Sequence, residues 1–212
     1  MMKGVKFDDV HSYYDLNLVL SEVKIPPATA KTNLVDIPGG DGSVDLTEAL
    51  GEVKYKDRNC KFTFTVFPSD DFEEKKRKIS NLLNGKRCRI TVDKDPDYYW
   101  IGRCSVDEYS SNKNLHKIVV GATVAPYKLK TNQTTVVIHA GEGVTKTLQN
   151  GRKTVVPTIT CTAETTVIFG GNTFTFGVGT HKNLDIELVE GGNAVTVTSD
   201  EDVTVSYQEG DL

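Results

Sequence analysis

The segment "IPGGDGSVDLTEALG", residues 37–51, combines glycines, aspartates and a proline that could serve three kinds of chemistry. It could cradle a phosphate, hold a calcium ion, or act as an ordered loop that reaches another molecule. A phosphate loop carries a lysine after its glycines or opens a helix directly behind them, and neither follows Gly42. An EF-hand loop needs alternating ligands between two helices, and the spacing from Asp36 to Glu48 does not provide them. The pattern therefore favours a structured turn or arm.

Other side chains that could do chemistry are scattered along the chain. Its histidines are His11, His116, His139 and His181. None has a second histidine or a cysteine at metal-ligand spacing, and no serine lies in the G-x-S-x-G pattern of hydrolases. The paired acids at 70–71 and 200–202 fall at an expected helix start and an expected turn, where acids are ordinary. We therefore expect no catalytic residue, no cofactor and no metal, and predict that the chain is not an enzyme.

One basic cluster could bind nucleic acid or an acidic partner. It comprises residues 75–78 together with Lys86, Arg87 and Arg89. Four acids stand beside it, and no aromatic residues are interleaved for base stacking. The net charge of −4 also argues against a general nucleic-acid footprint. We interpret the cluster as a solvated helix face, with an inter-subunit ion pair as the alternative.

The cysteines and the hydropathy indicate the cellular compartment of the chain. Cys60, Cys88, Cys104 and Cys161 form no C-x-x-C pair, and most of them alternate with apolar residues. We expect buried, reduced thiols and assembly in a reducing cytoplasm. No stretch approaches the roughly 18 apolar residues of a membrane span, and the start lacks a run typical of a signal peptide, so we expect neither membrane insertion nor signal-directed secretion.

Alternating apolar and polar residues predict strands over most of the chain. The runs "CKFTFTVFP" and "KRCRITVD" alternate clearly, and residues 99–109 and 115–124 flank a turn and predict a hairpin. One helix is expected near 69–84, because acids precede bases along it and Gly85 is a natural C-terminal stop. Ser69 is its expected start, and its apolar stripe is Phe72, Ile79, Leu82 and Leu83.

The pattern changes after Pro126 and divides the chain. Residues 1–127 hold 19 basic and 19 acidic side chains, whereas residues 128–212 hold 6 and 10. We predict a mainly β protein with an α+β N-terminal domain (1–127) that contains one helix, a linker (128–135), and an all-β sandwich (136–212). Short apolar runs separated by turn signals every 8–12 residues are typical of such a sandwich.

Several segments in this order resemble the distal tail protein family of siphophages and prophages. They are "FDDVHSYYDLNLVL", "VDIPGGDGSVDLTEALGEVKYKDRNCKFTF", "YYWIGRCSV", "VGATVAPYKLK" and "LVEGGNAVTVTSDEDVTVSYQEGDL". The resemblance covers nearly the whole chain, and its specificity lies in the order of the pieces. It implies a structural hub component of the tail-tip baseplate, with a ring-forming belt domain first and a galectin-like sandwich second.

The resemblance also implies partners and a location. Members form a homo-oligomer, a hexameric ring at the virion tail tip, that joins the tail tube protein to the tail-associated or baseplate hub protein. Receptor-binding proteins attach peripherally, and phage DNA passes through the central channel without specific binding. Assembly takes place in the cytoplasm of the host bacterium. The alternatives are a carbohydrate-binding module in the sandwich that contributes to host adsorption, and a tail tube or terminator protein.

The resemblance and the residue pattern together place the subunit contact in the glycine-rich segment. A stretch of Gly, Pro and Asp can adopt unusual backbone angles and pair with the sheet edge of a neighbour. An internal hairpin loop within the same subunit is the other interpretation. The residues expected at the subunit interface are Ile37, Pro38, Gly39, Gly40, Asp41, Gly42, Asp45 and Leu46.

Overall fold

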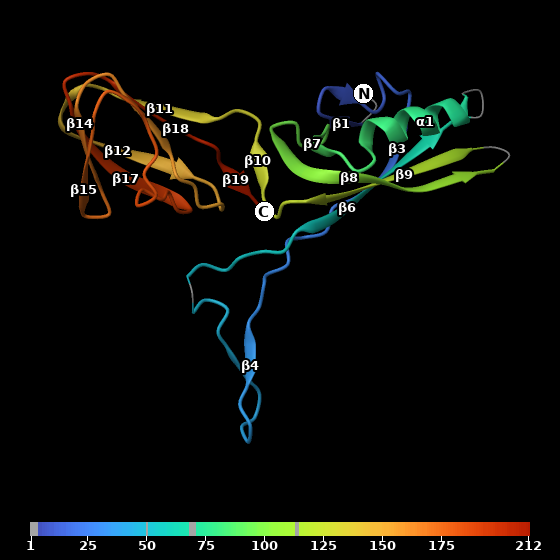
Figure 1. Ribbon diagram of the computed structural model, residues 1–212, viewed down its shortest axis with the longest axis horizontal. Coiled ribbons are helices and arrows are strands. Elements are labelled where there is room, and N and C mark those ends of the chain that lie inside the picture. Colours follow the sequence, from blue (N-terminus) through green and yellow to red (C-terminus); the bar gives the residue numbers. More distant parts are fainter. Residues whose placement is uncertain (1–3, 50, 68–70, 113–114) are drawn as a thin grey trace. The chain divides into compact units, whose positions relative to one another are not determined.

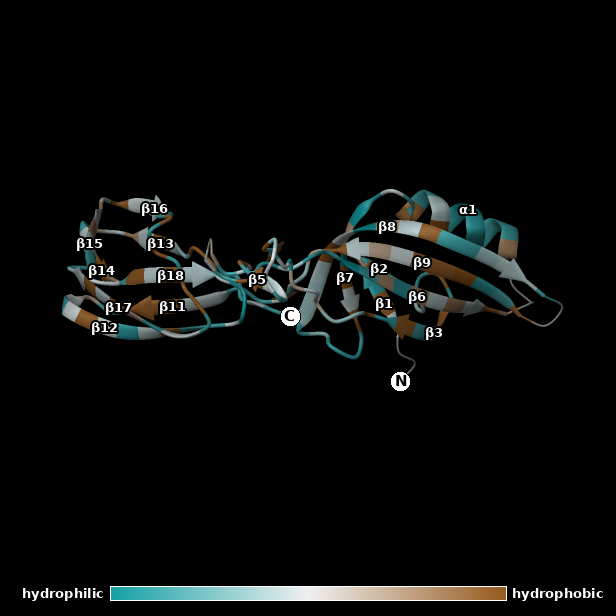
Figure 2. Cartoon of the chain, turned by 90° about the horizontal axis from the view of Figure 1, so that it is seen from below, coloured by the Kyte–Doolittle hydropathy of each residue, from teal (hydrophilic) through white to brown (hydrophobic). Residues whose placement is uncertain are grey.

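Strands make up most of the chain, and the predicted mainly β class is confirmed (Figure 1). The computed structural model describes residues 4–49, 51–67, 71–112 and 115–212. Contacts divide the chain into two compact units, Met1–Pro126 and Tyr127–Leu212. In Figure 2, bands of hydrophobic and hydrophilic colour follow one another along the strands of both units.

The first unit is built on one antiparallel sheet with strand order β2-β1-β7-β8-β9-β6-β3. Two further strands, β4 and β5, form a separate pair. The strands are β1 (Val5–Phe7), β2 (Val10–His11), β3 (Val19–Lys24), β4 (Leu34–Asp36), β5 (Ser43–Asp45), β6 (Arg58–Val66), β7 (Arg87–Val92), β8 (Tyr98–Ser111) and β9 (His116–Val124). The predicted hairpin is confirmed, because β8 and β9 pair antiparallel.

Alternation along these strands sends one set of side chains into the core. On β6, Cys60, Phe62, Phe64 and Val66 are buried, as their period of two predicts. The same core takes in Ile90 from β7 and the corresponding residues of β8 and β9. The opposite face of β7, β8, β9 and β6 does not carry the helix, and Lys61, Arg87 and Arg103 are exposed on it.

The predicted helix is present as α1 (Phe72–Leu83). Asp71 caps its start, because its carboxylate accepts the Glu74 N–H at 3.0 Å. The expected start, Ser69, lies outside the described residues. Gly85 follows the helix with φ 75°, a left-handed conformation that favours glycine. Ile79 and Leu83 are buried in the sheet core, and in Figure 2 most of α1 carries the hydrophilic colour.

The second unit is a sandwich of two four-stranded antiparallel sheets, β11-β18-β13-β16 and β12-β17-β14-β15. Both sheets contribute to one apolar core, with Ile159 and Val205 from one and Leu148 and Val197 from the other. The strands are β10 (Lys128–Lys130), β11 (Thr134–Ile138), β12 (Gly141–Asn150), β13 (Thr158–Cys161), β14 (Thr165–Phe169), β15 (Asn172–Phe176), β16 (Gly179–His181), β17 (Gly191–Ser199), β18 (Val203–Tyr207) and β19 (Gly210–Asp211).

Residues 128–135, expected as a linker, contain β10 and the first residues of β11. Strand β10 pairs with β19, so Lys128 lies opposite Asp211 at the other end of the unit. Lys130 donates to the Glu209 carboxylate at 2.7 Å, and Thr134 donates to the other oxygen of that carboxylate. This segment therefore holds the C-terminal residues of its own unit.

Within the described part of the chain, α1 is too short and too polar to span a bilayer.

Candidate functional site

The glycine-rich segment forms the end of a long hairpin, called here the arm (residues 29–56). Strand β4 pairs with β5, with Val35 opposite Val44. Pairing continues toward the base of the arm, where Ala30 bridges Tyr55. In Figure 1 the label β4 marks this ribbon. Among the described residues, β4 and β5 pair only with each other, so the arm is a two-stranded sheet.

The predicted interface residues Ile37 to Gly42 make the turn of the arm. The Gly40 N–H donates to the Ile37 carbonyl at 3.1 Å. Gly39 and Gly42 have φ of 82° and 75°, and a Cβ on either would meet open space. The glycines are therefore required for their backbone angles and not for lack of room.

Asp45 and Leu46, the other two predicted interface residues, lie on the returning side of the hairpin. The Asp45 carboxylate accepts the Thr47 N–H at 2.9 Å. Hydrogen bonds from the Thr47 side chain and backbone lower the pKa of Asp45. The Leu46 N–H donates to the Asn33 carbonyl at 2.8 Å. The structure therefore brings all eight predicted residues into one hairpin end, and their contact with another subunit stays a prediction.

The arm exposes apolar side chains that a larger sheet would bury. Val35 and Val44 form a cross-strand pair and are each 43% exposed. Ile37 and Leu46 are 53% and 40% exposed. An isolated two-stranded hairpin is marginal in water, and it gains stability when an apolar face packs against something else. The exposed faces of the arm therefore suit burial against a further surface.

A second unusual surface lies on the face of the first-unit sheet opposite α1. Arg87 on β7 lies directly across from Arg103 on β8, and both are exposed. Lys24 on β3 likewise lies across from Lys61 on β6. Like charges directly opposite one another destabilise a sheet. The sequence pattern indicated Arg87 and Arg89 as candidates for an acidic partner but missed Arg103, because only the strand register brings Arg103 beside Arg87.

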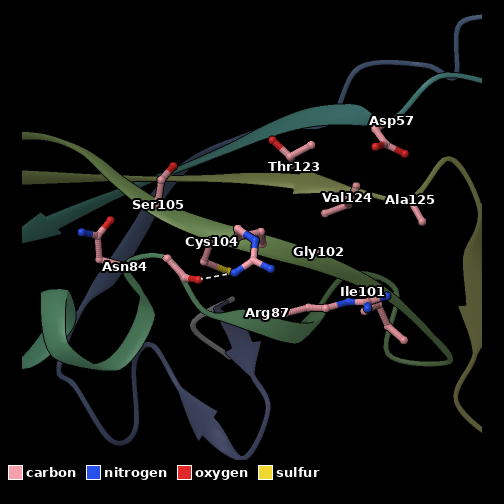
Figure 3. A pocket seen from close by; sticks show the side chains of 12 residues that line it. Asp57, Asn84, Arg87, Ile101, Gly102, Cys104, Ser105, Thr123, Val124 and Ala125 are labelled. Atoms are coloured by element: carbon pink, nitrogen blue, oxygen red, sulfur yellow. Dashed lines mark hydrogen bonds between the residues drawn. The ribbon is translucent and has the colours of Figure 1, made fainter.

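The arginines border an open groove of about 670 Å³, called here the arginine groove (Figure 3). Ile101 and Ala125 contribute apolar surface to its lining, and Asp57 contributes a carboxylate. The Arg103 guanidinium donates to the Gly85 carbonyl at 2.6 Å, which fixes its position at the end of α1. The groove therefore combines apolar lining with positive charge.

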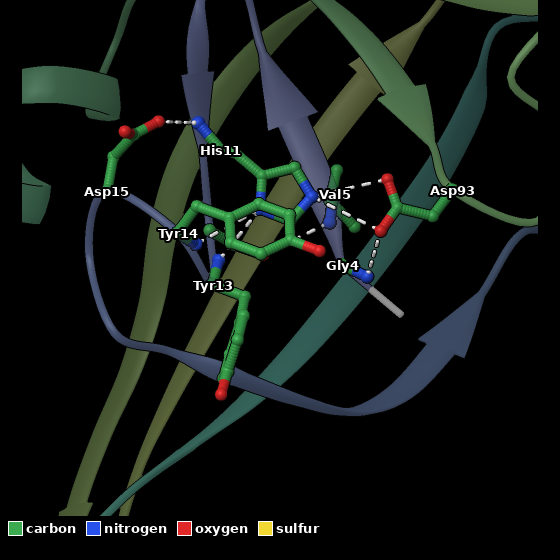
Figure 4. Close-up of polar contacts among 8 residues, drawn as sticks. Gly4, Val5, His11, Tyr13, Tyr14, Asp15 and Asp93 are labelled. Atoms are coloured by element: carbon green, nitrogen blue, oxygen red, sulfur yellow. Dashed lines mark hydrogen bonds and ion pairs between the residues drawn. The ribbon is translucent and has the colours of Figure 1, made fainter. Parts of the chain in front are cut away.

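One histidine has an arrangement that resembles catalytic machinery (Figure 4). His11 Nε2 lies 3.2 Å from both oxygens of Asp93. However, His11 Nδ1 accepts the N–H groups of Tyr13 and Tyr14 at 3.1 and 3.2 Å. Nδ1 therefore carries no proton, and Nε2 donates to Asp93. Because both ring nitrogens already have hydrogen-bond partners within the chain, the imidazole has a structural role and is not a free base.

Ser12 stands next to this histidine but does not complete a nucleophilic pair with it. Its side chain is buried, and its Oγ accepts the Val5 N–H at 3.0 Å. Asp93 also accepts the Gly4 N–H, at 2.6 Å. These bonds join β1, β2 and the end of β7, so the cluster holds the N-terminal segment on the sheet.

The four cysteines are free and buried. Burial raises the pKa of Cys60 to about 11, and burial also raises the pKa of Cys88 and Cys104. Neutral thiols are poor nucleophiles and poor metal ligands. Over the described residues, no three His, Cys, Asp or Glu side chains gather where they could hold a metal ion.

The phenylalanine and tyrosine side chains of the sandwich pack in or against its own core. Phe176 and Tyr207 are buried, and Phe169 and Phe174 pack partly buried against the same cluster. The Tyr207 hydroxyl donates to the Gln149 carbonyl at 2.5 Å. A sugar-binding platform of the usual kind presents an aromatic face to solvent, and these four rings serve packing instead.

Comparison with known proteins assigns the class. Residues 10–123, more than half of the chain, match the family described as phage tail protein RIFT-related domain. The chain belongs to this family of phage tail proteins. Its fold is similar to the crystal structure of the Dit (gp 19.1) protein of phage SPP1, with a TM-score of 0.72 and 15% identity over 100% of both chains. That protein is described as a paradigm of the hub adsorption apparatus in phages that infect Gram-positive bacteria. No curated protein matches the sequence.

Proposed function

We propose that this phage tail protein is a distal tail protein, a non-enzymatic structural component of the tail tip. Six copies form a ring that joins the tail tube to the tail-associated or baseplate hub protein and leaves a channel for DNA. Family membership and the fold shared with the SPP1 Dit protein support this role. The single observation that carries the ring is the arm with its exposed apolar faces.

The arm supplies what a ring contact needs. In a closed ring, each copy uses one surface toward the next copy and a different surface toward the previous one. A hairpin with unpaired strand edges and exposed Val35, Val44 and Leu46 gives one such surface. Burial of these side chains on a neighbour would remove apolar surface from water and stabilise both the contact and the hairpin.

Deletion of residues 37–51 tests the proposal most directly. We expect the deletion to abolish oligomers while the second unit keeps its fold, because that unit shares no core residue with the arm. Native mass spectrometry across a concentration series, with negative-stain images, measures the outcome. Tail extracts that lack the native protein provide a template if assembly requires one.

A milder pair of variants separates the arm from general surface apolarity. Val35→Ser with Val44→Ser changes two residues that are each 43% exposed in the arm. The matched control is Val178→Ser with Leu184→Ser, at 73% and 79% exposed in the second unit. We expect the first pair to weaken oligomers and the control to leave them unchanged. Rings that persist after the deletion would exclude the arm as the ring contact.

A further inference from the structure

We infer that the arginine groove of one copy receives the acidic arm of another copy. The inference rests on the proposed function, in which the arm joins neighbouring copies, and it adds the surface that accepts the arm. The occupant is therefore a second copy of this chain.

The groove carries positive charge that its own chain leaves unpaired. Within the described residues, the Arg87 side chain makes no hydrogen bond or ion pair, and Arg87 lies directly opposite Arg103. The Arg103 guanidinium has one carbonyl partner, Gly85, which leaves its other N–H groups available. Asp57 is the one carboxylate among the described residues that line the groove. An additional carboxylate would relieve the repulsion between the two arginines.

Positive charge continues along the same face of the sheet. Lys61 lies opposite Lys24, and both are exposed. Two acids on this face have partners within the chain: Glu22 pairs with Lys24 at 3.2 Å, and Asp107 accepts the Ser105 hydroxyl at 2.6 Å. The arginine groove, where two guanidinium groups meet one carboxylate, therefore favours an acidic partner over a basic one.

The arm has the opposite charge. Between Lys31 and Lys54 the sequence contains Asp36, Asp41, Asp45, Glu48 and Glu52, and no lysine or arginine. These five carboxylates sit on a hairpin that is exposed along most of its length.

One face of the arm combines an apolar side chain with two of these carboxylates. Leu34, 58% exposed, lies directly opposite Asp45, and Asp36 is two residues further along the same strand. Alternation places Leu34, Asp36 and Asp45 on the same side of the hairpin. This side matches a groove that has Ile101 and Ala125 in its lining beside two arginines.

Guanidinium groups suit this partner in particular. The planar fork of arginine binds a carboxylate through two parallel hydrogen bonds, which fixes orientation as well as charge. Opposite charges across an interface also steer encounter and select the register. Because the groups are exposed before contact, association is expected to weaken as salt increases.

Complementation between two variants tests the inference. The first variant lacks residues 37–51 and keeps the groove. The second carries Arg87→Glu and Arg103→Glu and keeps the arm. We expect each to lose self-association by on the order of a hundredfold, and an equimolar mixture to form a complex of one copy of each, identified by its mass in native mass spectrometry. Its dissociation constant should rise roughly tenfold when NaCl increases from about 0.05 to about 0.5 M.

Charge-matched controls test whether the arginine groove or the net charge of the chain determines association. Lys94→Glu with Lys146→Glu changes the net charge by the same amount at exposed positions outside the groove. We expect this control to associate as the wild-type chain does. Trp100 fluorescence and far-ultraviolet circular dichroism establish that all variants are folded.

The outcomes separate the inference from the proposed function. If the groove-reversed variant self-associates normally while the arm deletion does not, the arm binds elsewhere, and the inference fails although the proposed function stands. If the arm deletion self-associates normally, the proposed ring contact itself fails. A mixture without a complex, or a wild-type chain that remains monomeric at every concentration, also overturns the inference, because groove and arm would then not recognise each other.

Discussion

On the outer sheet face, the first unit has a cross-strand pair of like charges, whereas the second unit has a cross-strand pair of threonines. In the first unit Arg87 lies across from Arg103. In the second unit Thr145 lies across from Thr196, with their hydroxyl oxygens 2.8 Å apart. Paired threonines stabilise a sheet by about 0.2–1 kcal/mol, whereas opposed like charges destabilise it. At these positions the cross-strand pair of the second unit is favourable in the isolated chain, and that of the first unit is not.

This difference bears on the proposal that the first unit carries the contacts between copies. Proteins depart from locally favourable choices mainly at functional sites. In the described part of the first unit, two departures stand out, the opposed basic side chains and the arm with exposed Val35 and Val44. The outer sheet faces of the second unit instead carry cross-strand threonine pairs such as Thr160 and Thr180. The comparison is consistent with the proposal that the first unit carries the copy-to-copy contact.

The largest expected effect tests whether the two units are energetically separate. Phe64 is fully buried in the first unit and packs edge-on against Phe7 with ring centroids 6.5 Å apart. Phe64→Ala should lower the unfolding free energy of that unit by about 3–5 kcal/mol, because it removes buried apolar surface and leaves a cavity. Trp100 is the single tryptophan of the chain and is 6% exposed. Its fluorescence during urea unfolding reports on the first unit.

The matched change in the second unit is Leu148→Ala. Leu148 is 1% exposed in the sandwich core, and its truncation should cost about 2–5 kcal/mol. We expect it to shift the circular dichroism transition and to leave the Trp100 midpoint in place. If either substitution moved both transitions together, the two units would unfold as one, and the comparison between them would lose its basis.

The sequence predicts those parts of the fold that depend on local pattern. Period-two alternation identified β6, β7 and the β8–β9 hairpin, and charge order with Gly85 identified α1. The pairing of β10 with β19 was not foreseen, because two or three residues are too few for a period and the partners are 83 positions apart at Lys128 and Asp211. Short strands of this kind form only when the rest of the unit brings them together.

The candidate site was predictable to a similar extent. Glycines and acids marked the arm, and its turn falls at residues 37–42. The sequence pattern places Arg87 in a basic cluster and favours a solvated helix face for that cluster. The sheet register is what places Arg103 next to Arg87 and away from the helix cations. Register is a long-range property of strand pairing, so a one-dimensional pattern does not contain it.

A smaller effect compares two histidine–aspartate pairs, one in each unit. His11 has a side chain 13% exposed, binds Asp93, and accepts two backbone N–H groups. His139 is 83% exposed and binds Asp202 at 3.1 Å. His11→Ala should cost about 1–3 kcal/mol, because it leaves the partly buried Tyr13 N–H and the more exposed Tyr14 N–H without their acceptor. His139→Ala should cost about 0–1 kcal/mol, as exposed pairs do.

Urea unfolding, followed by Trp100 fluorescence for His11→Ala and by circular dichroism for His139→Ala, measures these two values. Equal costs would mean that the bonds of His11 to the Tyr13 and Tyr14 backbone contribute nothing to the stability of the first unit.

The next effect concerns the outer faces themselves. Arg87→Thr removes a charge that faces Arg103, so the free energy of unfolding of the first unit should rise by about 0.2–1 kcal/mol. Thr145→Ala removes a threonine pair and should lower the stability of the second unit by a similar amount. Thermal or urea unfolding of monomeric protein checks both signs. A loss of stability in Arg87→Thr would show that the arginine pair already supports the isolated fold.

The smallest effect is the titration of two exposed aspartates, Asp45 in the arm and Asp202 in the sandwich. The pKa of Asp45 is lowered chiefly by its hydrogen bond with the Thr47 side chain, and the pKa of Asp202 chiefly by the Ala140 N–H, with His139 second. Each carboxylate therefore contributes stability above its ordinary pKa that is lost as the pH falls through its lower folded-state pKa.

Carboxyl ¹³C NMR titration should give both pKa values below the ordinary range for aspartate. Thr47→Ala should return Asp45 most of the way to that range, whereas His139→Ala should return Asp202 only partly, because the backbone donor remains. A full return of Asp202 would mean that the histidine, and not the fold of the β11–β12 turn, sets its charge.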